Sequence, residues 1–255
     1  MGGTLAAKRG EMMRRFFFDP AEEKDGVVRL GAEESHHLAK VLRLQAGDEV
    51  ELFDGAGRVY TATILSANRQ AELALGEVCL EEKAGGAELV LLQSVLKTER
   101  MDLAIQKATE LGVTRLLPIH TSRCQGKLSA AVKRVARWRR ISLAACKQCM
   151  RPHIMEIMEP VAMKEALATL PPDFAKILFW EEEEQCGLQK FTEKIAAAPG
   201  VAICLGPEGG ITVEEAECAK QLGWQSVSLG RRVLRAETAT ITTVSLMQFF
   251  MGNLG

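Results

Sequence analysis

Two glycine-rich turns in the last quarter of the chain hold the residues best placed for ligand chemistry. Each turn follows a short apolar run and precedes a segment with helical periodicity. The first reads Gly206-Pro207-Glu208-Gly209-Gly210, and the second begins at Leu229-Gly230. Glycines there let backbone N–H and C=O groups approach a ligand closely, because no Cβ stands in the way. If the two apolar runs are parallel strands, both turns lie where ligands of α/β proteins bind, at the carboxyl edge of the sheet.

Neither turn matches a known nucleotide fingerprint. The chain has no G-x-G-x-x-G after an expected strand and no G-x-x-x-x-G-K-[ST]. A dinucleotide site and a P-loop are therefore not supported.

Basic residues are concentrated in the middle of the chain. Residues 111–155 contain ten Lys and Arg and no Asp or Glu, although the whole chain has a net charge of −1. A segment of one sign and this length is typical of phosphate binding, and we favour an RNA-binding interpretation. The alternative is a solvated helix face that acidic neighbours balance in the folded protein.

The composition is that of an ordinary soluble globular protein, with 47% hydrophobic and 25% charged residues. No apolar run is long enough to span a membrane, so no membrane partner is expected. The seven scattered cysteines do not form a disulfide framework, which favours a reducing cytoplasm. Cys146-x-x-Cys149 with His153 lacks a fourth ligand, so we expect packing cysteines and no metal.

The elements that must position these residues fall into two groups. Residues 14–82 contain strand-like runs at 27–30, 48–53, 58–66 and 70–80, with one short helix after a predicted N-cap at Ser35. A small β-barrel is the economical way to close such strands. The segment 83–86 is typical of a linker, and residues 1–13 form an N-terminal extension without a pattern.

From residue 88 onward, strands and helices alternate, which predicts a parallel sheet with right-handed connections. Apolar runs at 89–95, 113–119 and 177–180 precede the two glycine-turn strands. A long helix at 128–150 carries most of the basic residues, and a last helix spans 237–251. Gly112 is placed to stop the helix before it, and Thr212 with Glu215 forms a capping box.

The two turns together resemble the ribosomal RNA small subunit methyltransferase E family. The resemblance lies in Gly206-Pro207-Glu208-Gly209-Gly210 and in Leu229-Gly230-x-Arg232-Val233-Leu234-Arg235-x-Glu237-Thr238-Ala239. In addition, His36-His37-Leu38-x-x-Val41-Leu42-Arg43 is similar to the family's N-terminal RNA-binding domain. The family implies an α/β fold with a PUA-like β-barrel domain, here 14–84, and a C-terminal α/β-knot (SPOUT trefoil-knot) domain with a parallel sheet, here 87–255.

The same resemblance implies the activity and the partners. Family members use S-adenosyl-L-methionine to methylate N3 of a uridine in the 16S rRNA of the small ribosomal subunit, and knotted methyltransferases generally form homodimers. No metal is required, because positioning can supply much of the rate. The residues that match the cofactor loops are Leu205, Gly206, Gly210, Leu229, Gly230, Val233 and Leu234.

Arg235 and Glu237 are the predicted catalytic residues beside the target base. Arg235 can neutralise the negative charge that develops on the uridine. Glu237 can accept a proton, orient Arg235, or simply complement the helix dipole. The candidates for contacts with rRNA phosphates are Arg14, Arg15, Arg43, Arg100, Arg123, Lys127 and Arg151.

Two other functions are compatible with the sequence. One is a non-catalytic rRNA-binding protein that uses the small domain and the basic segment. The other is a related knotted enzyme that methylates the ribose 2′-oxygen or another base.

Overall fold

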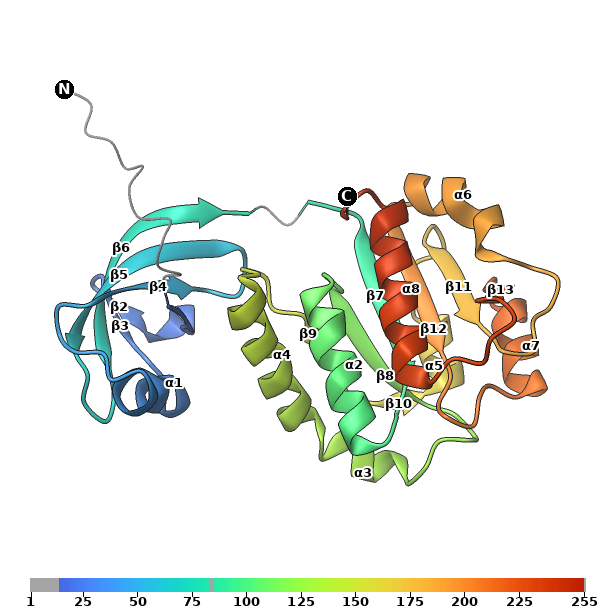
Figure 1. Ribbon diagram of the computed structural model, residues 1–255, viewed down its shortest axis with the longest axis horizontal. Helices are drawn as coiled ribbons and strands as arrows, with labels where there is room; N and C mark the ends of the chain where they lie inside the picture. The colour runs from blue at the N-terminus through green and yellow to red at the C-terminus, as the bar shows by residue number, and fades with distance from the viewer. Residues whose placement is uncertain (1–13, 83–84, 255) are drawn as a thin grey trace. The chain divides into compact units, whose positions relative to one another are not determined.

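The computed structural model of the protein describes residues 14–82 and 85–254 and divides into two compact units (Figure 1). The first unit comprises Met1–Ala84 and Lys147–His153, and the second comprises Gly85–Cys146 and Ile154–Gly255. The predicted extension 1–13 and residues 83–84 of the predicted linker lie outside the described residues. Residues 147–153 belong to the first unit although they follow much of the second along the chain. The domains predicted from the sequence, 14–84 and 87–255, place this segment in the second domain.

The first unit is built on a six-stranded sheet of order β1-β4-β5-β6-β3-β2. Neighbouring strands are antiparallel, except for the parallel pair β1–β4. A short α-helix continues into a π-helical turn after β3. The elements are β1 (Arg15–Phe17), the 3-10 turn η1 (Pro20–Glu22), β2 (Glu23–Lys24), β3 (Val27–Arg29), α1 (Ala32–His36), η2 (His37–Val41), β4 (Glu49–Phe53), β5 (Arg58–Ser66) and β6 (Glu72–Glu81).

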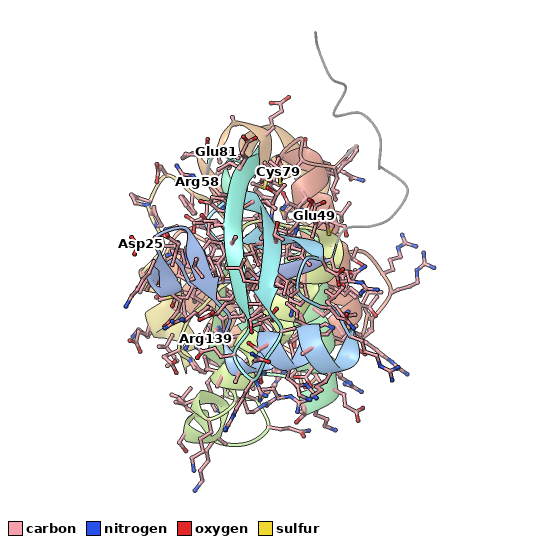
Figure 2. All side chains as sticks on the ribbon, turned by 90° about the vertical axis from the view of Figure 1, so that its left-hand side faces the viewer. Asp25, Glu49, Arg58, Cys79, Glu81 and Arg139 are labelled. Carbon is pink, nitrogen blue, oxygen red and sulfur yellow. The ribbon has the colours of Figure 1, made fainter. Side chains whose placement is uncertain are left out.

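Alternation along the strands builds the core of this unit. Val50 and Leu52 of β4 are buried, and Ala62 and Ile64 of β5 join them in one apolar cluster, while Thr63 between the two β5 residues faces solvent. On the exposed face, Arg58 of β5 pairs with Glu81, the residue opposite on β6, at 2.9 Å (Figure 2). Strands β4 and β5 lie within the strand-like runs predicted from the sequence, 48–53 and 58–66.

The predicted N-cap at Ser35 is wrong. Helix α1 begins at Ala32, its N-cap is Gly31, and Ser35 is buried within the helix. The Ser35 hydroxyl donates to the carbonyl oxygen of Leu30 at 3.1 Å and accepts from the backbone N–H of Ala71 at 3.0 Å. The side chain therefore fastens the helix to the strands, and this long-range use overrides the local capping preference of serine.

The second unit is built on a seven-stranded sheet in which every pair is parallel. The strand order is β10-β8-β7-β12-β11-β13, with β9 also pairing β8. Its strands are β7 (Glu88–Ser94), β8 (Arg115–His120), β9 (Glu156–Ile157), β10 (Val161–Ala162), β11 (Ala175–Phe179), β12 (Gly200–Leu205) and β13 (Gln225–Val227). Its helical elements are α2 (Thr98–Glu110), α3 (Leu128–Val132), α4 (Val135–Cys149, whose last residues belong to the first unit), α5 (Met163–Ala168), the 3-10 turn η3 (Leu188–Phe191), α6 (Thr192–Ala197), α7 (Val213–Gln221) and α8 (Ala236–Phe250).

Each face of this sheet has its own apolar core. Helices α2, α4, α6 and α8 supply the residues that cover one face, which include Met101, Trp138 and Met247. Helices α5 and α7 cover the other, where Trp224 is buried. The central strands are buried on both sides, and β12 has no exposed residue. This explains their continuous apolar sequence.

Local signals set the ends of several helices as predicted. Gly112 follows α2 with φ +84°, and the N–H groups of Gly112 and Val113 bond to the carbonyls of Thr109 and Ala108.

The long helix predicted at 128–150 is instead two helices, α3 and α4, which are separated at 133–134.

The capping box at the start of α7 yields a stability prediction. Thr212 accepts from the backbone N–H of Glu215 at 3.2 Å, and the Glu215 carboxylate accepts from that of Thr212 at 3.0 Å. Thr212→Ala should lower the free energy of unfolding in urea by about 1 kcal/mol, because one N–H loses its partner. The control is Thr98→Ala at the exposed first residue of α2, where the change should stay within about 0.5 kcal/mol. Equal effects in the two variants would contradict a capping role.

Candidate active site

The carboxyl ends of five parallel strands gather five loops at one edge of the second unit. Because β7, β8, β11, β12 and β13 run in the same direction, the segments that follow them share that edge. These segments are residues 95–97, 121–127, 180–187, 206–212 and 228–235. Both glycine turns predicted from the sequence are among them, after β12 and β13.

The glycine loop after β12 is held in place by the loop after β11. The indole N–H of Trp180 donates to the carbonyl oxygen of Ile211 at 3.1 Å, and the Glu181 carboxylate accepts from the N–H of Ile211 at 3.2 Å. Gly210 has φ +77°, and a Cβ there would overlap the carboxylate of Glu181. A Cβ on Gly206 would lie 3.0 Å from Ile211. The loop therefore needs glycine both for its backbone and for its contacts.

A side-chain hydrogen bond also joins the loop after β11 to strand β13. Glu183 accepts from the hydroxyl of Ser226 in β13, and this hydrogen bond lowers the pKa of the Glu183 carboxyl.

Within β12, burial raises the pKa of the Cys204 thiol far above its ordinary value, with a smaller contribution from Glu215. Cys204 therefore packs as a small neutral side chain next to Leu205.

The glycine loop after β13 is more open. Gly230 has φ +102°, and no atom lies within 4 Å of the position that a Cβ would take. Leu229 and Leu234 are half-buried, whereas Val233 is 93% exposed. In the described structure, the backbone of residues 231–234 forms no hydrogen bond with another loop or strand. Its N–H and C=O groups are available to a ligand.

Three charged side chains from different segments meet beside these loops. Arg100, in the first turn of α2, lies 3.3 Å from Glu208 of the first glycine loop and 3.8 Å from Glu237 of α8. Arg235 is the N-cap residue of α8 and is exposed. Its side chain has no hydrogen bond or ion pair with the rest of the described chain. The arrangement combines a free guanidinium, a bound guanidinium and two carboxylates at the edge where a ligand would enter.

Comparisons with known proteins agree with this geometry. The sequence matches the family described as RNA methyltransferase domain over residues 83–248 and the RNA methyltransferase PUA domain over 30–74. The ribosomal RNA small subunit methyltransferase E of Buchnera aphidicola is 30% identical, over 89% of this chain and 92% of that protein. This chain belongs to the ribosomal RNA small subunit methyltransferase E family.

Two solved structures resemble this methyltransferase E family member throughout. One is a ribosomal RNA small subunit methyltransferase E from Neisseria gonorrhoeae bound to S-adenosyl methionine, with 32% identity and a TM-score of 0.81. It aligns over 93% of this chain and 98% of that one. The other is a protein from Legionella pneumophila in complex with the same cofactor, with 31% identity, a TM-score of 0.84 and coverage of 94% and 98%. The predicted fold class, a PUA-like β domain and a knotted α/β methyltransferase domain with a parallel sheet, is confirmed.

The loops of this family member fit such a cofactor. The first loop is held by contacts in which a Cβ at Gly206 or Gly210 would press on Ile211 or Glu181, and the open backbone at 231–234 offers hydrogen-bonding groups. Leu205, Leu229 and Leu234 provide apolar surface at the same edge. Sequence patterns located these loops but missed Trp180 and Glu181, which hold the first loop in place. A Trp-Glu pair after a strand has no motif that would signal this role.

The seven candidates for rRNA phosphates occupy different environments. Arg14 and Arg43 are exposed in the first unit, where Arg43 has φ +55°. Arg123 and Lys127 are exposed in the loop after β8, and Arg123 donates to the carbonyl oxygen of Gly209 at 3.0 Å. Arg151 is half-buried. Arg100 is half-buried and forms the ion pairs with Glu208 and Glu237 described above.

The prediction for Arg15 needs correction. Its side chain is only 6% exposed, and it donates two hydrogen bonds to the Glu51 carboxylate, at 2.8 and 2.7 Å. A third donor lies 2.6 Å from the carbonyl oxygen of Met150. With these donors engaged and the side chain buried, Arg15 holds the first unit together and does not present a charge to RNA.

The basic segment 111–155 is partly neutralised in the folded protein. Arg115, Arg137, Arg139 and Lys147 form ion pairs with Glu88, Asp102, Glu159 and Glu34. Arg134 lies over the ring of Trp138, and burial lowers the pKa of this arginine. The interpretation as a helix face balanced by acidic neighbours therefore holds for these four of the ten cations. The cations at the site edge, Arg123 and Lys127, are exposed.

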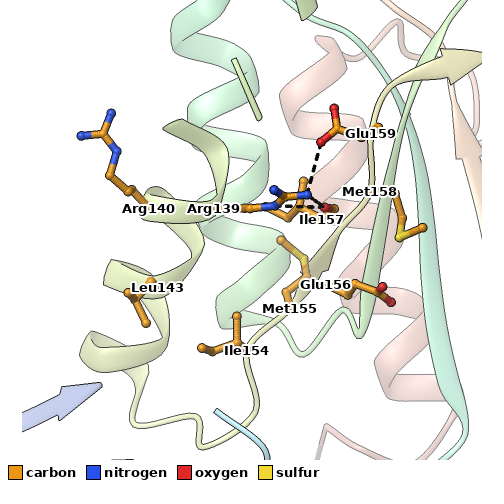
Figure 3. Close-up of a pocket in the computed structure, with 9 residues that line it drawn as sticks. All are labelled: Arg139, Arg140, Leu143, Ile154, Met155, Glu156, Ile157, Met158 and Glu159. Atoms are coloured by element: carbon orange, nitrogen blue, oxygen red, sulfur yellow. Dashed lines mark hydrogen bonds and ion pairs between the residues drawn. The ribbon is translucent and has the colours of Figure 1, made fainter. Parts of the chain in front are cut away.

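A surface groove of about 550 Å³ lies elsewhere in the second unit (Figure 3). Helix α4 and residues 154–159 line it, and Arg139 crosses it to the carbonyl oxygen of Ile157 at 3.0 Å. Because β9 pairs with the start of β8, this groove is at the opposite end of the strands from the glycine loops. It is separate from the candidate active site.

Two remaining expectations concern metals and membranes. Cys146 is buried and Cys149 is half-buried, while the His153 ring lies 2.9 Å from the carbonyl oxygen of Glu82. No helix in residues 14–82 and 85–254 is long and apolar enough to cross a bilayer.

Proposed function

We propose that this protein transfers the methyl group of S-adenosyl-L-methionine to N3 of a uridine in the 16S rRNA of the small ribosomal subunit. The observation that carries the proposal is that two glycine loops lie at the same carboxyl edge of the sheet, where the second leads directly into the exposed Arg235 at the N-cap of α8. The names of the related proteins and the cofactor in two similar structures support it. The cofactor would bind against Leu205, Gly206, Gly210, Leu229, Gly230, Val233 and Leu234.

When bound, the cofactor supplies an electrophilic methyl group on a sulfonium. The two loops orient it through backbone groups and exclude water from it. Loss of the N3 proton leaves negative charge over O2, N3 and O4 of the uridine. N3 then bonds to the methyl group while the bond from that methyl group to the sulfonium sulfur breaks, and its electron pair stays on sulfur. Arg235 stabilises that charge as a planar donor. Glu237, half-buried two residues further along, accepts the proton directly or through a water molecule.

We assign rRNA recognition to the first unit together with the exposed cations Arg14, Arg43, Arg123 and Lys127 and the half-buried Arg151. Positive side chains of this kind contribute affinity for phosphates without reading sequence. The corresponding domain boundaries are 14–84 and 87–255. We infer that the protein works in the cytoplasm, where its substrate is assembled.

We also infer that the protein is a homodimer. Along α8, Thr238, Thr242, Ser245 and Phe249 lie on one helical face, and Phe249 is 60% exposed. Small residues around an exposed aromatic ring suit close helix packing with a second copy. Light scattering during gel filtration measures this directly, and a monomer mass at micromolar concentration would contradict it.

The activity itself makes a direct prediction. Small ribosomal subunits that lack the modification are incubated with the protein and labelled S-adenosylmethionine, and the rRNA is digested to nucleosides. Mass analysis should find 3-methyluridine. A ribose-methylated nucleoside would keep the fold and refute the proposed position. Tight subunit binding without any methylated product would favour the non-catalytic RNA-binding alternative.

A further inference from the structure

Arg100 connects the two glycine loops of the candidate active site. Its Nη1 lies 3.3 Å from Oε1 of Glu208, in the middle of the first loop, and its Nε lies 3.8 Å from Oε2 of Glu237, in the first turn of α8 after the second loop. The same Glu208 oxygen accepts from the backbone N–H of Lys97 at 3.2 Å. One guanidinium therefore lies between carboxylates that are 29 residues apart in the sequence.

These three side chains are partly shielded from water. The exposed fractions are 36% for Arg100, 18% for Glu208 and 13% for Glu237. The Glu237 Oε2 atom is buried and forms no hydrogen bond with a described residue, so its nearest positive charge is Arg100. In such surroundings charges interact more strongly than in bulk water. Without Arg100, two carboxylates would face each other with no cation between them.

The start of helix α8, which carries Glu237, is anchored to the sheet by a buried hydrogen bond. One turn further along α8, the Thr240 hydroxyl donates to Oε1 of Gln93 at 2.6 Å, and both residues are fully buried. Gln93 lies near the end of β7, the strand that leads into α2 and Arg100. The start of α8 is therefore anchored to the same strand end that positions the arginine.

We propose that Arg100 is a positioning residue: it ties the first glycine loop to the start of α8 and holds the Glu237 carboxylate in place in the first turn of that helix, which Arg235 caps. This inference rests on the proposed methyl transfer. It replaces the predicted contact of Arg100 with rRNA phosphates. The position requires arginine because two different nitrogens serve two carboxylates, whereas the ammonium of lysine is a single point charge.

The test compares Arg100→Gln and Arg100→Lys with the wild type at saturating cofactor. For Arg100→Gln, kcat on small subunits should fall on the order of 100-fold, because a misplaced group near the reacting atoms has effects of this size. KM for the subunits should stay within about twofold, since no phosphate contact is lost. Arg100→Lys should recover only part of kcat. The control Arg115→Gln removes an ion pair with Glu88 at the opposite end of the strands and should leave kcat unchanged.

A second measurement does not depend on activity. The thermal midpoint of the cofactor-free protein is measured for Arg100→Gln, for Glu208→Gln and for the double variant. Because the two side chains act as one unit, the double variant should lose clearly less than the sum of the single losses. Additive losses would show that the two residues are independent.

The outcomes separate this inference from the proposed function. An unchanged kcat for Arg100→Gln, or a raised KM with normal kcat, would overturn the positioning role, and the second result would restore the phosphate contact. If the wild type forms no methylated product, the proposed function fails instead. The thermal coupling between Arg100 and Glu208 then decides whether the two loops are tied.

Discussion

Replacing Arg235 with alanine is expected to lower kcat for methyl transfer on the order of 100- to 1,000-fold while leaving the affinity for S-adenosylmethionine unchanged. The exposed guanidinium at the N-cap of α8 has no partner among the described residues, so its loss removes no internal contact. The target base would lose a donor that matters only once negative charge develops on the uridine, and removing one such donor has effects of this size. Single-turnover kinetics with small subunits measure the rate, and calorimetry measures cofactor binding.

A matched pair of variants separates charge from geometry. Arg235→Lys keeps the positive charge but not the planar set of donors, and we expect it to recover only a minor part of the lost rate. Arg115→Ala removes an arginine of the same unit far from the loops and should not change kcat. A loss of cofactor affinity in Arg235→Ala that equals its loss of rate would assign Arg235 to the cofactor pocket instead.

The glycine loops could be located from the sequence because their signals are local. An apolar run followed by Gly206 or Gly230 marks a buried strand that ends in a turn, and the structure has β12 and β13 there. The capping box of Thr212 and the stop at Gly112 are local in the same sense. Such signals depend on neighbours within a few residues, so one sequence contains all the information they need.

The contacts that complete the site could not be predicted in this way. Glu208 lies 108 residues from Arg100, and Glu237 lies 137 residues away. Which carboxylate neutralises which arginine depends on how strands far apart in the sequence are ordered in the sheet. For the same reason, composition could not tell that Arg15 is bound by Glu51 and Met150, or that four of the ten cations in segment 111–155 form ion pairs.

The family resemblance and the chemistry of individual residues explain different properties of this protein. The resemblance supplied the cofactor, the substrate and the knotted fold, none of which follows from periodicity or charge. The residues supplied the reasons for individual positions, such as the need for glycine at 210. Val233 shows the difference: the motif places it in the cofactor loop, yet its side chain is 93% exposed in the structure. Its contact with the cofactor remains a prediction.

Replacing Gly210 with alanine is expected to weaken cofactor binding on the order of 100-fold. The backbone at φ +77° costs an L-residue roughly 1–2 kcal/mol, and the added Cβ would overlap the Glu181 carboxylate. Glu181 must then move away, which releases the N–H of Ile211 and loosens the loop that Trp180 also holds. Alanine can relieve this strain by moving the loop out of the conformation that holds the cofactor, and each 1.4 kcal/mol lost in this way is a factor of ten in affinity. Calorimetric titration with S-adenosylmethionine measures it.

The chain contains a natural control for this experiment. Gly223, in the turn between α7 and β13, has φ +85°, and no atom lies within 4 Å of the position of a Cβ. Gly223→Ala therefore carries the backbone cost without the overlap, and it should lower the free energy of unfolding by roughly 1–2 kcal/mol while cofactor affinity stays normal. The difference between the two variants isolates the contact with Glu181. Normal affinity in Gly210→Ala would show that the loop adapts to a side chain at this position. It would also show that the close contact between residue 210 and Glu181 does not contribute to cofactor binding.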